Sequence, residues 1–251
     1  MSSKQQPALG AKIRAVIFDM GGVVVKSPFI AISSYEGEHG LPGNYINVAL
    51  SRRGSEGAFQ RYERGELEHE EFVEQWTEEL NDTEANNAAY SEYLERRGAL
   101  SRPVELPDKA AISGRELFGR MMETTQKVNQ CMVDLIGWLR GSGYRVAGLT
   151  NNFKDSEVGG EEGVRRLLDE YVESSVEGMR KPDPRFYMVA CRRLGVRPEE
   201  AVFLDDIAAN VRAAAGLGMV GVRVRLGNEA QAVDTVKRIV QARGAYGVAR
   251  I

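Results

Sequence analysis

The chain has 251 residues, of which 43% are hydrophobic and 27% are charged, a balance that is ordinary for a globular protein of one large or two modest domains. Its formal net charge of −3 provides no overall attraction to nucleic acid or to an anionic membrane surface. Its two cysteines, Cys131 and Cys191, are too few for a disulfide framework or a zinc site, and they fit a reducing compartment.

The amino-terminal segment is polar and lacks the apolar core of a secretory signal, so we expect residues 1–12 to form a polar tail. No apolar run in the chain reaches the roughly 18 residues that a membrane-spanning helix needs. Together with the cysteine usage, these features predict a cytoplasmic protein with no membrane association and no nucleic-acid partner.

The first ordered element is predicted at residues 13–19. The run Ala15-Val16-Ile17-Phe18 is short, apolar and partly β-branched, and a Gly21-Gly22 pair follows it. This pattern is typical of a buried strand that ends in a tight turn, with Asp19 at the carboxyl end of the strand.

The segment from residue 29 to residue 127 is predicted to be helical. It is polar and interrupted by turn signals, and its apolar residues recur at helical intervals, as in Tyr62, Leu67, Phe72, Val73 and Trp76. The segment is too long for a simple crossover between two strands. We therefore interpret residues 29–127 as an inserted α-helical cap domain.

After residue 128, apolar strands alternate with amphipathic helices. Strands are predicted at residues 144–149, 175–177, 201–204 and 220–224, and helices at residues 132–139, 163–171, 184–194, 207–217 and 229–241. Such alternation predicts an α/β fold with a doubly wound, Rossmann-like parallel sheet. The α/β core then comprises residues 13–28 and 128–251, with the cap inserted after the first strand.

Polar residues follow four of the predicted strands. Asp19 ends the first strand, Thr150 the second and the pair Asp205-Asp206 a later one, while Lys181 comes shortly after the short third strand. Ligands of such sheets bind at the carboxyl ends of the strands, so these side chains are expected to converge at one edge.

These residue types suit phosphoryl transfer. A carboxylate such as Asp19 can attack phosphorus, but it is an anion and needs cations between itself and the phosphate. A Mg²⁺ ion held by carboxylates provides two positive charges, and Lys181 provides a third. The sequence therefore predicts a magnesium site and a small phosphorylated substrate.

Four motifs resemble those of the haloacid dehalogenase superfamily in the same order. They are Phe18-Asp19-Met20-Gly21-Gly22-Val23, Leu149-Thr150-Asn151, Lys181-Pro182 and Phe203-Leu204-Asp205-Asp206. The sequence from residue 173 to residue 218 is similar to the amino-terminal phosphatase domain of soluble epoxide hydrolase and to the matching domain of an acyl-CoA dehydrogenase fusion protein. The resemblance covers nearly the whole chain.

The resemblance implies a role for each matched residue. Asp19 would be the nucleophile and a metal ligand, and the backbone carbonyl of Gly21 a further ligand. Thr150 and Asn151 would bind the phosphate, and Lys181 would hold Asp19 and the phosphate together. Of the acidic pair, Asp206 would bind the metal directly with Asp205 beside it, and Asn210 would support the pair.

One position departs from the family pattern. Most phosphatases of the family carry a second aspartate two residues after the nucleophile, where it protonates the leaving group and then activates water. Here that residue is Gly21. General acid–base catalysis contributes roughly 10² to 10⁴ in rate, so we expect slow hydrolysis of alkyl phosphates and a preference for acyl, anomeric or aryl phosphates.

Two other functions remain open at this stage. Gly21 also fits a catalytically weak or inactive protein that binds a phosphorylated ligand or a partner. A haloacid dehalogenase could use the same Asp19 nucleophile, but it works without metal and leaves the Asp205-Asp206 pair without a task. The cap would determine which substrate is accepted. Four of its residues could either face the site or pack inside the cap: Arg52, Arg53, Phe59 and Tyr62.

Overall fold

The computed structural model describes residues 11–98, 104–153 and 163–244. Most of the tail predicted at residues 1–12 lies outside these ranges. Within them, a five-stranded parallel sheet has the order β3-β2-β1-β4-β5. The strands are β1 (Ala15–Phe18), β2 (Arg145–Thr150), β3 (Glu170–Glu173), β4 (Ala201–Asp205) and β5 (Val220–Arg223).

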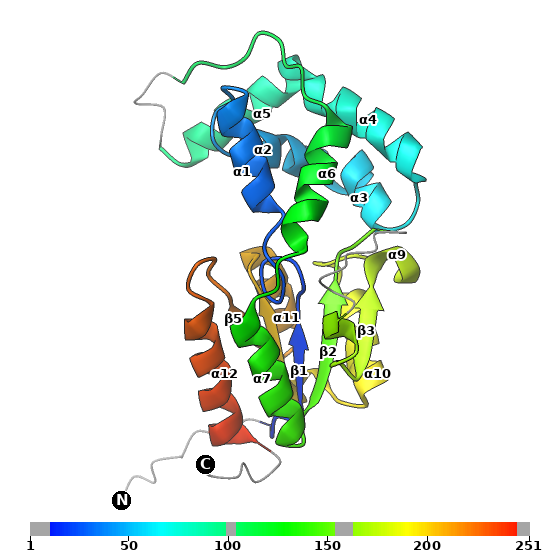
Figure 1. Ribbon diagram of the computed structural model, residues 1–251, viewed down its shortest axis with the longest axis vertical. Coiled ribbons are helices and arrows are strands. Elements are labelled where there is room, and N and C mark those ends of the chain that lie inside the picture. The colour runs from blue at the N-terminus through cyan, green and yellow to red at the C-terminus, as the bar shows by residue number, and fades with distance from the viewer. Residues whose placement is uncertain (1–10, 99–103, 154–162, 245–251) are drawn as a thin grey trace, which may run out of the picture.

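Helices cover both faces of the sheet, as a doubly wound fold requires (Figure 1). Helices α7 (Gln130–Gly141) and α12 (Glu229–Arg243) pack together on one face, and α10 (Pro184–Leu194) and α11 (Ala208–Gly216) cover the other. The pleat of β1 explains how both faces become apolar, because Val16 and Phe18 join one core cluster while Ala15 and Ile17 join the other. The predicted α/β fold class is confirmed.

A helical block interrupts this pattern between β1 and α7. It comprises α1 (Phe29–Glu38), α2 (Tyr45–Arg52), α3 (Ala58–Glu63), α4 (His69–Asn81), α5 (Thr83–Arg96) and α6 (Gly114–Thr125), with a short 3₁₀ turn at Gly54–Glu56. The block has its own apolar cluster, in which Phe72 and Trp76 are fully buried, and Phe153 of the sheet part joins it. We propose that these helices are the cap domain, with the predicted bounds 29–127.

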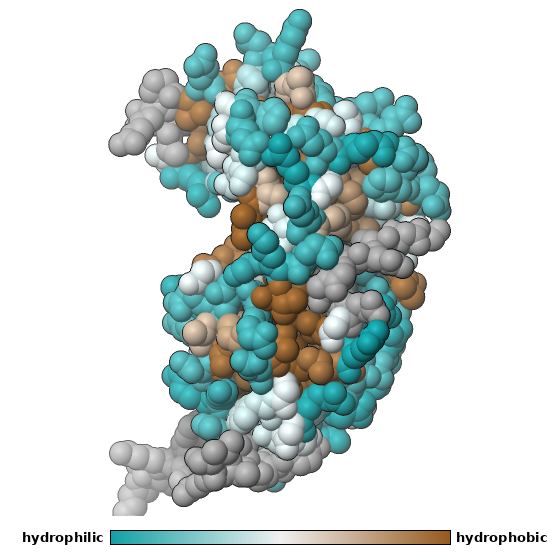
Figure 2. All heavy atoms as spheres, viewed as in Figure 1, coloured by the Kyte–Doolittle hydropathy of each residue, from teal (hydrophilic) through white to brown (hydrophobic). Residues whose placement is uncertain are grey.

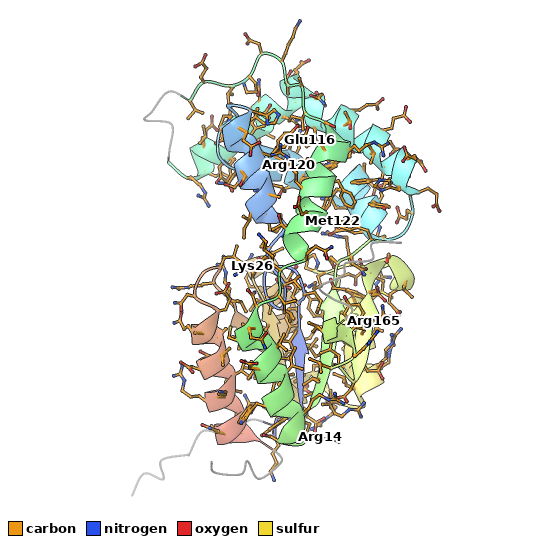
Figure 3. All side chains as sticks on the ribbon, in the orientation of Figure 1. Arg14, Lys26, Glu116, Arg120, Met122 and Arg165 are labelled. Carbon is orange, nitrogen blue, oxygen red and sulfur yellow. The ribbon has the colours of Figure 1, made fainter. Side chains whose placement is uncertain are left out.

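The cap stands over the carboxyl ends of the strands (Figure 1). On the face drawn in Figure 2, the outline is notched where the two parts meet, and hydrophobic residues show at the notch. The two chain segments that join the cap to the sheet part lie side by side there. Val25 forms a β-bridge with Val128, and the amide of Lys26 donates to the carbonyl of Lys127 at 2.8 Å. Lys26 lies at this junction (Figure 3).

One predicted strand was misplaced. The third strand is Glu170–Glu173, not 175–177, and residues Ser174–Glu177 instead form the short helix α9. The helix predicted at residues 163–171 is also wrong over most of its length, because only residues 163–165 are helical, residues 166–169 form a turn and a bend, and residues 170 and 171 belong to β3. β3 is an edge strand in which only Val172 is fully buried, so its residues lack the continuous apolar run of a central strand. Among the described residues, no helix combines the length and the apolar character needed to cross a membrane.

Candidate active site

Asp19 occupies the carboxyl end of the central strand. Its amide continues the ladder by donating to the carbonyl of Leu204 at 2.9 Å, and the residue is only 6% exposed. The Oδ1 atom accepts hydrogen bonds from the amide of Met20 at 2.7 Å and from Nζ of Lys181 at 2.5 Å. Oδ2 receives no hydrogen bond from the described residues, so one oxygen of the carboxylate is held and the other is left available.

The turn after Asp19 brings the chain against the acidic pair. Gly22 has a φ of 83°, which glycine adopts at no steric cost, and a Cβ there would lie 2.3 Å from Oδ2 of Asp206. Gly21 has space for a side chain, although its Cβ would meet Cδ of Pro28 at 3.3 Å. Gly22 is therefore required by the close approach of Asp206, whereas Gly21 is not required by the backbone.

Lys181 is an almost fully buried cation, 1% exposed, between two carboxylates. Its Nζ donates to Oδ1 of Asp19 at 2.5 Å and to Oδ2 of Asp205 at 3.0 Å. Burial lowers the pKa of Lys181, but the charges and hydrogen bonds of Asp19 and Asp205 outweigh it and raise that pKa above its ordinary value. The lysine therefore stays charged and ties the first strand to the fourth.

The two carboxylates of the acidic pair have different surroundings. Both oxygens of Asp205 accept hydrogen bonds from Nδ2 of Asn210, Oδ1 also accepts from the amide of Ile207, and Oδ2 also accepts from Lys181. By contrast, Oδ1 of Asp206 is buried and has no partner among the described residues. Asp205 is thus occupied by protein donors, and Asp206 is the member of the pair that needs a ligand.

The donor set fits a divalent cation. One ligand atom each of Asp19, Asp205 and Asp206 can be chosen so that all three lie within 4.8 Å of one another. Burial and the charge of Asp205 raise the pKa of Asp19 well above its usual value, against the effect of Lys181. Burial and Asp205 also raise the pKa of Asp206 to about 7. One lysine does not balance three clustered carboxylates, and a hard cation with oxygen ligands would complete the balance.

Thr150 and Asn151 lie at the end of β2, beside the end of β1. The side chain of Asn151 is committed to Lys181, since Oδ1 accepts from the lysine amide at 2.8 Å and Nδ2 donates to the lysine carbonyl at 3.1 Å. Asn151 lines the pocket described below, whereas Thr150 is 3% exposed and is not among its lining residues. The structure thus brings all the predicted residues to one sheet edge and gives Asn151 a visible part in holding Lys181.

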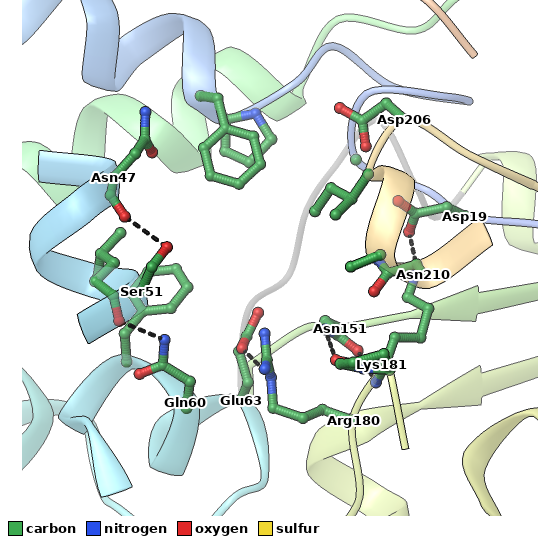
Figure 4. Close-up of a pocket in the computed structure, with 18 of the residues that line it drawn as sticks. Asp19, Asn47, Ser51, Gln60, Glu63, Asn151, Arg180, Lys181, Asp206 and Asn210 are labelled. Atoms are coloured by element: carbon green, nitrogen blue, oxygen red, sulfur yellow. Dashed lines mark hydrogen bonds and ion pairs between the residues drawn. The ribbon is translucent and has the colours of Figure 1, made fainter. Parts of the chain in front are cut away.

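A pocket of about 760 Å³ lies between the sheet edge and the cap. In Figure 4 one wall carries Asp19, Asp206, Asn210 and Lys181, and the facing wall carries Asn47, Ser51 and Gln60 of the cap. Ligand pockets for drug-sized molecules fall in the range of about 300–1,000 Å³, so this one has room for much more than a phosphate group.

Sequence reasoning missed an ion pair on the floor of this pocket. Oε2 of Glu63, at the end of α3, lies 2.5 Å from Nε of Arg180, which directly precedes Lys181 (Figure 4). The carbonyl of Glu63 also accepts a hydrogen bond from Oγ of the buried Ser174 at 2.5 Å. Burial raises the pKa of Glu63, against the lowering effect of Arg180. The only feature of the sequence that could have indicated Glu63 is helical spacing, since Phe59 and Glu63 are four residues apart on one face of α3.

Of the four cap residues named from the sequence, one lines the pocket and three do not. Phe59 lines the pocket. Arg53 pairs with Asp82 at 2.9 Å within the cap, and Tyr62 stacks on Phe72 with ring centroids 4.2 Å apart. Neither of these two residues, nor Arg52, is among the residues that line the pocket.

Comparison with known proteins identifies relatives across most of the chain. The profile of the haloacid dehalogenase-like hydrolases matches residues 13–218. Acyl-CoA dehydrogenase family member 10 of Mus musculus is 32% identical over 218 residues, which are 86% of this chain and 18% of that protein. Bifunctional epoxide hydrolase 2 of Sus scrofa is 28% identical over 223 residues, 85% of this chain and 36% of that protein. Glyceraldehyde 3-phosphate phosphatase of Methanopyrus kandleri is 28% identical over 165 residues, 64% of this chain and 69% of that protein. The chain spans well under half the length of the first two relatives.

Solved structures share the fold. A dehalogenase structure is 25% identical with a TM-score of 0.54, and the match covers 86% of this chain and 87% of that one. A HAD family enzyme from Bacteroides thetaiotaomicron, in complex with magnesium and inorganic phosphate, has a TM-score of 0.54 at 18% identity, covering 86% of this chain and 96% of that one.

Proposed function

The chain belongs to the haloacid dehalogenase-like hydrolases, and from that premise we propose that it is a magnesium-dependent phosphatase that acts through a phosphorylated Asp19 on substrates with good leaving groups. The observation that carries the proposal is the contrast within the acidic pair: Asp205 is occupied by protein donors, and the buried Oδ1 of Asp206 has none. A dehalogenase would have no use for that second carboxylate.

The proposed cation site consists of Asp19, Asp206 and the carbonyl of Gly21, with Asp205 beside them. A bound Mg²⁺ would supply the positive charge that allows an anionic carboxylate to approach a phosphate. The magnesium and phosphate of the Bacteroides enzyme occupy a protein of the same fold, which agrees with this assignment. The phosphatase activity named for the Methanopyrus relative agrees with the reaction type.

The proposed reaction has two displacements at phosphorus. First, an oxygen of Asp19 forms a bond to phosphorus while the bond to the ester oxygen breaks, and the ester oxygen leaves with the electron pair. Lys181 orients Asp19 through Oδ1 and lends its charge to the transferred group, and Asn151 fixes the main chain of Lys181. Water then attacks the aspartyl phosphate, releasing inorganic phosphate and restoring the carboxylate. Thr150 is proposed to help hold the phosphate.

Gly21 limits both displacements. It has no side chain to protonate the departing oxygen or to activate water, so leaving groups that are stable as anions should react faster. Gly21 also motivates a second candidate function, in which the site binds a phosphorylated ligand and turns it over weakly or not at all.

The test is phosphate release from aryl, acyl, sugar and alkyl phosphates, with and without Mg²⁺, by the wild-type chain and by an Asp19→Asn variant. Release that needs both Mg²⁺ and Asp19 and that ranks with leaving-group quality supports the proposal. Binding of phosphate without release supports the second candidate. Halide release from a 2-haloacid without metal would support a dehalogenase instead.

A further inference from the structure

The charges that line the pocket are unevenly distributed. At the sheet edge, Asp19, Asp206 and Lys181 belong to the proposed catalytic site. Among the other residues that line the pocket, only Glu63 and Arg180 are charged. Those two form an ion pair with 2.5 Å between Nε and Oε2. Beyond the catalytic cluster, the described residues that line the pocket therefore carry no net charge.

The Glu63–Arg180 pair is held in place from both parts of the protein. Glu63 belongs to the cap and is 6% exposed, and its main-chain carbonyl is fixed by Ser174 of the sheet part. Arg180 is bonded through the chain to Lys181, whose own main chain is held by Asn151. Only Nε of Arg180 meets Glu63, in an ion pair without hydrogen-bond geometry, and its two terminal nitrogens have no partner among the described residues. The pair is thus fixed, neutral as a unit, and still able to donate hydrogen bonds into the pocket.

The rest of this space offers mainly apolar surface. Phe29, Leu50, Phe59 and Met121 of the cap line it with Phe153 and Ile207. On the wall that faces Asp19 (Figure 4), Oδ1 of Asn47 is buried and receives no hydrogen bond from the described residues. The same holds for Oε1 of Gln60, whose Nε2 donates to the carbonyl of Leu50 at 3.1 Å and so fixes which amide atom is left over. Both oxygens have almost no accessible surface, and Oε1 of Gln60 lies 2.4 Å from the position of a Cβ on Gly57, so the surface that this wall presents to a ligand is mainly apolar.

We propose that the Glu63–Arg180 pair is a specificity determinant that makes this pocket select an uncharged leaving group with an apolar body and a hydroxyl or carbonyl oxygen that accepts from Arg180. The proposal rests on the proposed function, because it describes the part of the substrate that leaves. A leaving group with a carboxylate or a second phosphate would bring an uncompensated charge beside the ionised Glu63, and burial makes such a charge expensive. An uncharged group can instead pack against the apolar wall and accept a hydrogen bond from Arg180.

The charge of this pair can be varied one unit at a time. Glu63→Gln leaves Arg180 unpaired, Arg180→Gln leaves Glu63 unpaired, and the double variant is neutral again. The probes are two benzylphosphonates, which resist hydrolysis, one with a distal hydroxymethyl group and one with a distal carboxylate. Their dissociation constants are measured by titration calorimetry in the presence of Mg²⁺. Glu79→Gln is the matched control, since Glu79 is a half-buried cap glutamate that accepts from the amide of Ala58 and is not among the pocket's lining residues.

The wild-type chain is expected to bind the hydroxymethyl compound more tightly. Glu63→Gln should tighten binding of the carboxylate compound by about ten- to hundredfold, the effect of a charged hydrogen bond, and so reverse the preference. Arg180→Gln should weaken carboxylate binding further, and the double variant and Glu79→Gln should keep the wild-type order. An unchanged preference in both single variants, or tighter carboxylate binding by the wild-type chain, would overturn the proposal.

Because binding is measured without turnover, this result is separate from the proposed function. Asp19-dependent release of phosphate from phenyl phosphate, whose small leaving group has no distal polar group, tests the reaction alone. Release without any charge-dependent preference would reject only the specificity proposal. A charge-dependent preference without release would reject the phosphatase and keep a selective phospho-ligand site.

Discussion

Restoring an acidic side chain at Gly21 should accelerate the hydrolysis of poor leaving groups. The backbone permits it, because Gly21 does not have a positive φ. Among the described residues other than its chain neighbours, only Pro28 comes within 4 Å of an added Cβ, through Cδ at 3.3 Å and Cγ at 3.9 Å. Pro28 itself lines the pocket, so a Gly21→Asp side chain would start at the pocket wall. The tight contact should cost about 1 kcal/mol of stability, the low end for overpacking.

The expected gain follows from the value of proton transfer. General acid–base catalysis is worth roughly 10² to 10⁴ in rate, which corresponds to about 3 to 5 kcal/mol of activation free energy. For an alkyl phosphate, kcat/KM of Gly21→Asp should rise toward that range. For 4-nitrophenyl phosphate the rise should be much smaller, because its leaving group departs readily without a proton.

The assay compares kcat/KM across esters of graded leaving-group acidity. Gly21→Asn is the matched control, since it has the same size and cannot transfer a proton in this way. Pro28→Ala combined with Gly21→Asp removes the Cδ contact and tests whether crowding hides the effect. If the folded, Mg²⁺-binding double variant hydrolyses alkyl phosphates no faster than the wild-type chain, or if the wild-type chain hydrolyses alkyl and aryl esters equally well, the reasoning about Gly21 is wrong.

Three further predictions concern the carboxylate cluster. Gly22→Ala places Cβ 2.3 Å from Asp206 at a φ of 83° and should lower Mg²⁺ affinity by about ten- to hundredfold in a calorimetric titration; unchanged affinity would contradict the assigned ligand. Lys181→Met leaves Asp19 and Asp205 buried without their cation. It should abolish turnover and lower the free energy of unfolding, measured in urea without metal, by about 3–5 kcal/mol. A variant as stable as the wild-type chain would argue against the ion triad. Without metal, the folded-state pKa of Asp206, about 7, exceeds the unfolded value of about 3.9, so the folded chain binds more protons between those pH values. The unfolding free energy should therefore fall as pH rises through that window, by up to about 1.4 kcal/mol per pH unit, and Asp206→Asn should lose this part of the slope.

The core and its catalytic edge could be predicted because both depend on local patterns. Buried parallel strands are short apolar runs, and their carboxyl ends must meet at one edge, so Asp19, Asp205 and Asp206 could be placed together before any coordinates. The strand Glu170–Glu173 was not predicted, because it lies at the sheet edge and has only one fully buried residue. Its neighbour Ser174–Glu177 has the length of a strand but forms a single helical turn.

The cap side of the site could not be predicted in the same way. Glu63 and Arg180 are 117 positions apart, and nothing in either local sequence indicates that the cap brings them to 2.5 Å. The same applies to Asn47, which is one of many polar residues on cap helices until the packing of α2 shows that it faces Asp19 across the pocket (Figure 4). Contacts between an inserted helical block and a sheet depend on tertiary packing, which helical periodicity does not specify.

The most direct test of the central claim is to look for the phosphoryl group on Asp19. The wild-type chain is mixed with Mg²⁺ and 4-nitrophenyl phosphate, quenched in acid after milliseconds, and digested for mass spectrometry, with Asp19→Asn as the control. We expect a burst of one nitrophenolate per site and a phosphorylated Asp19 peptide, because the first displacement is fast and no side chain at Gly21 activates water for the second. Phosphate release that shows no burst and no modified Asp19, or that persists in Asp19→Asn, would contradict the account.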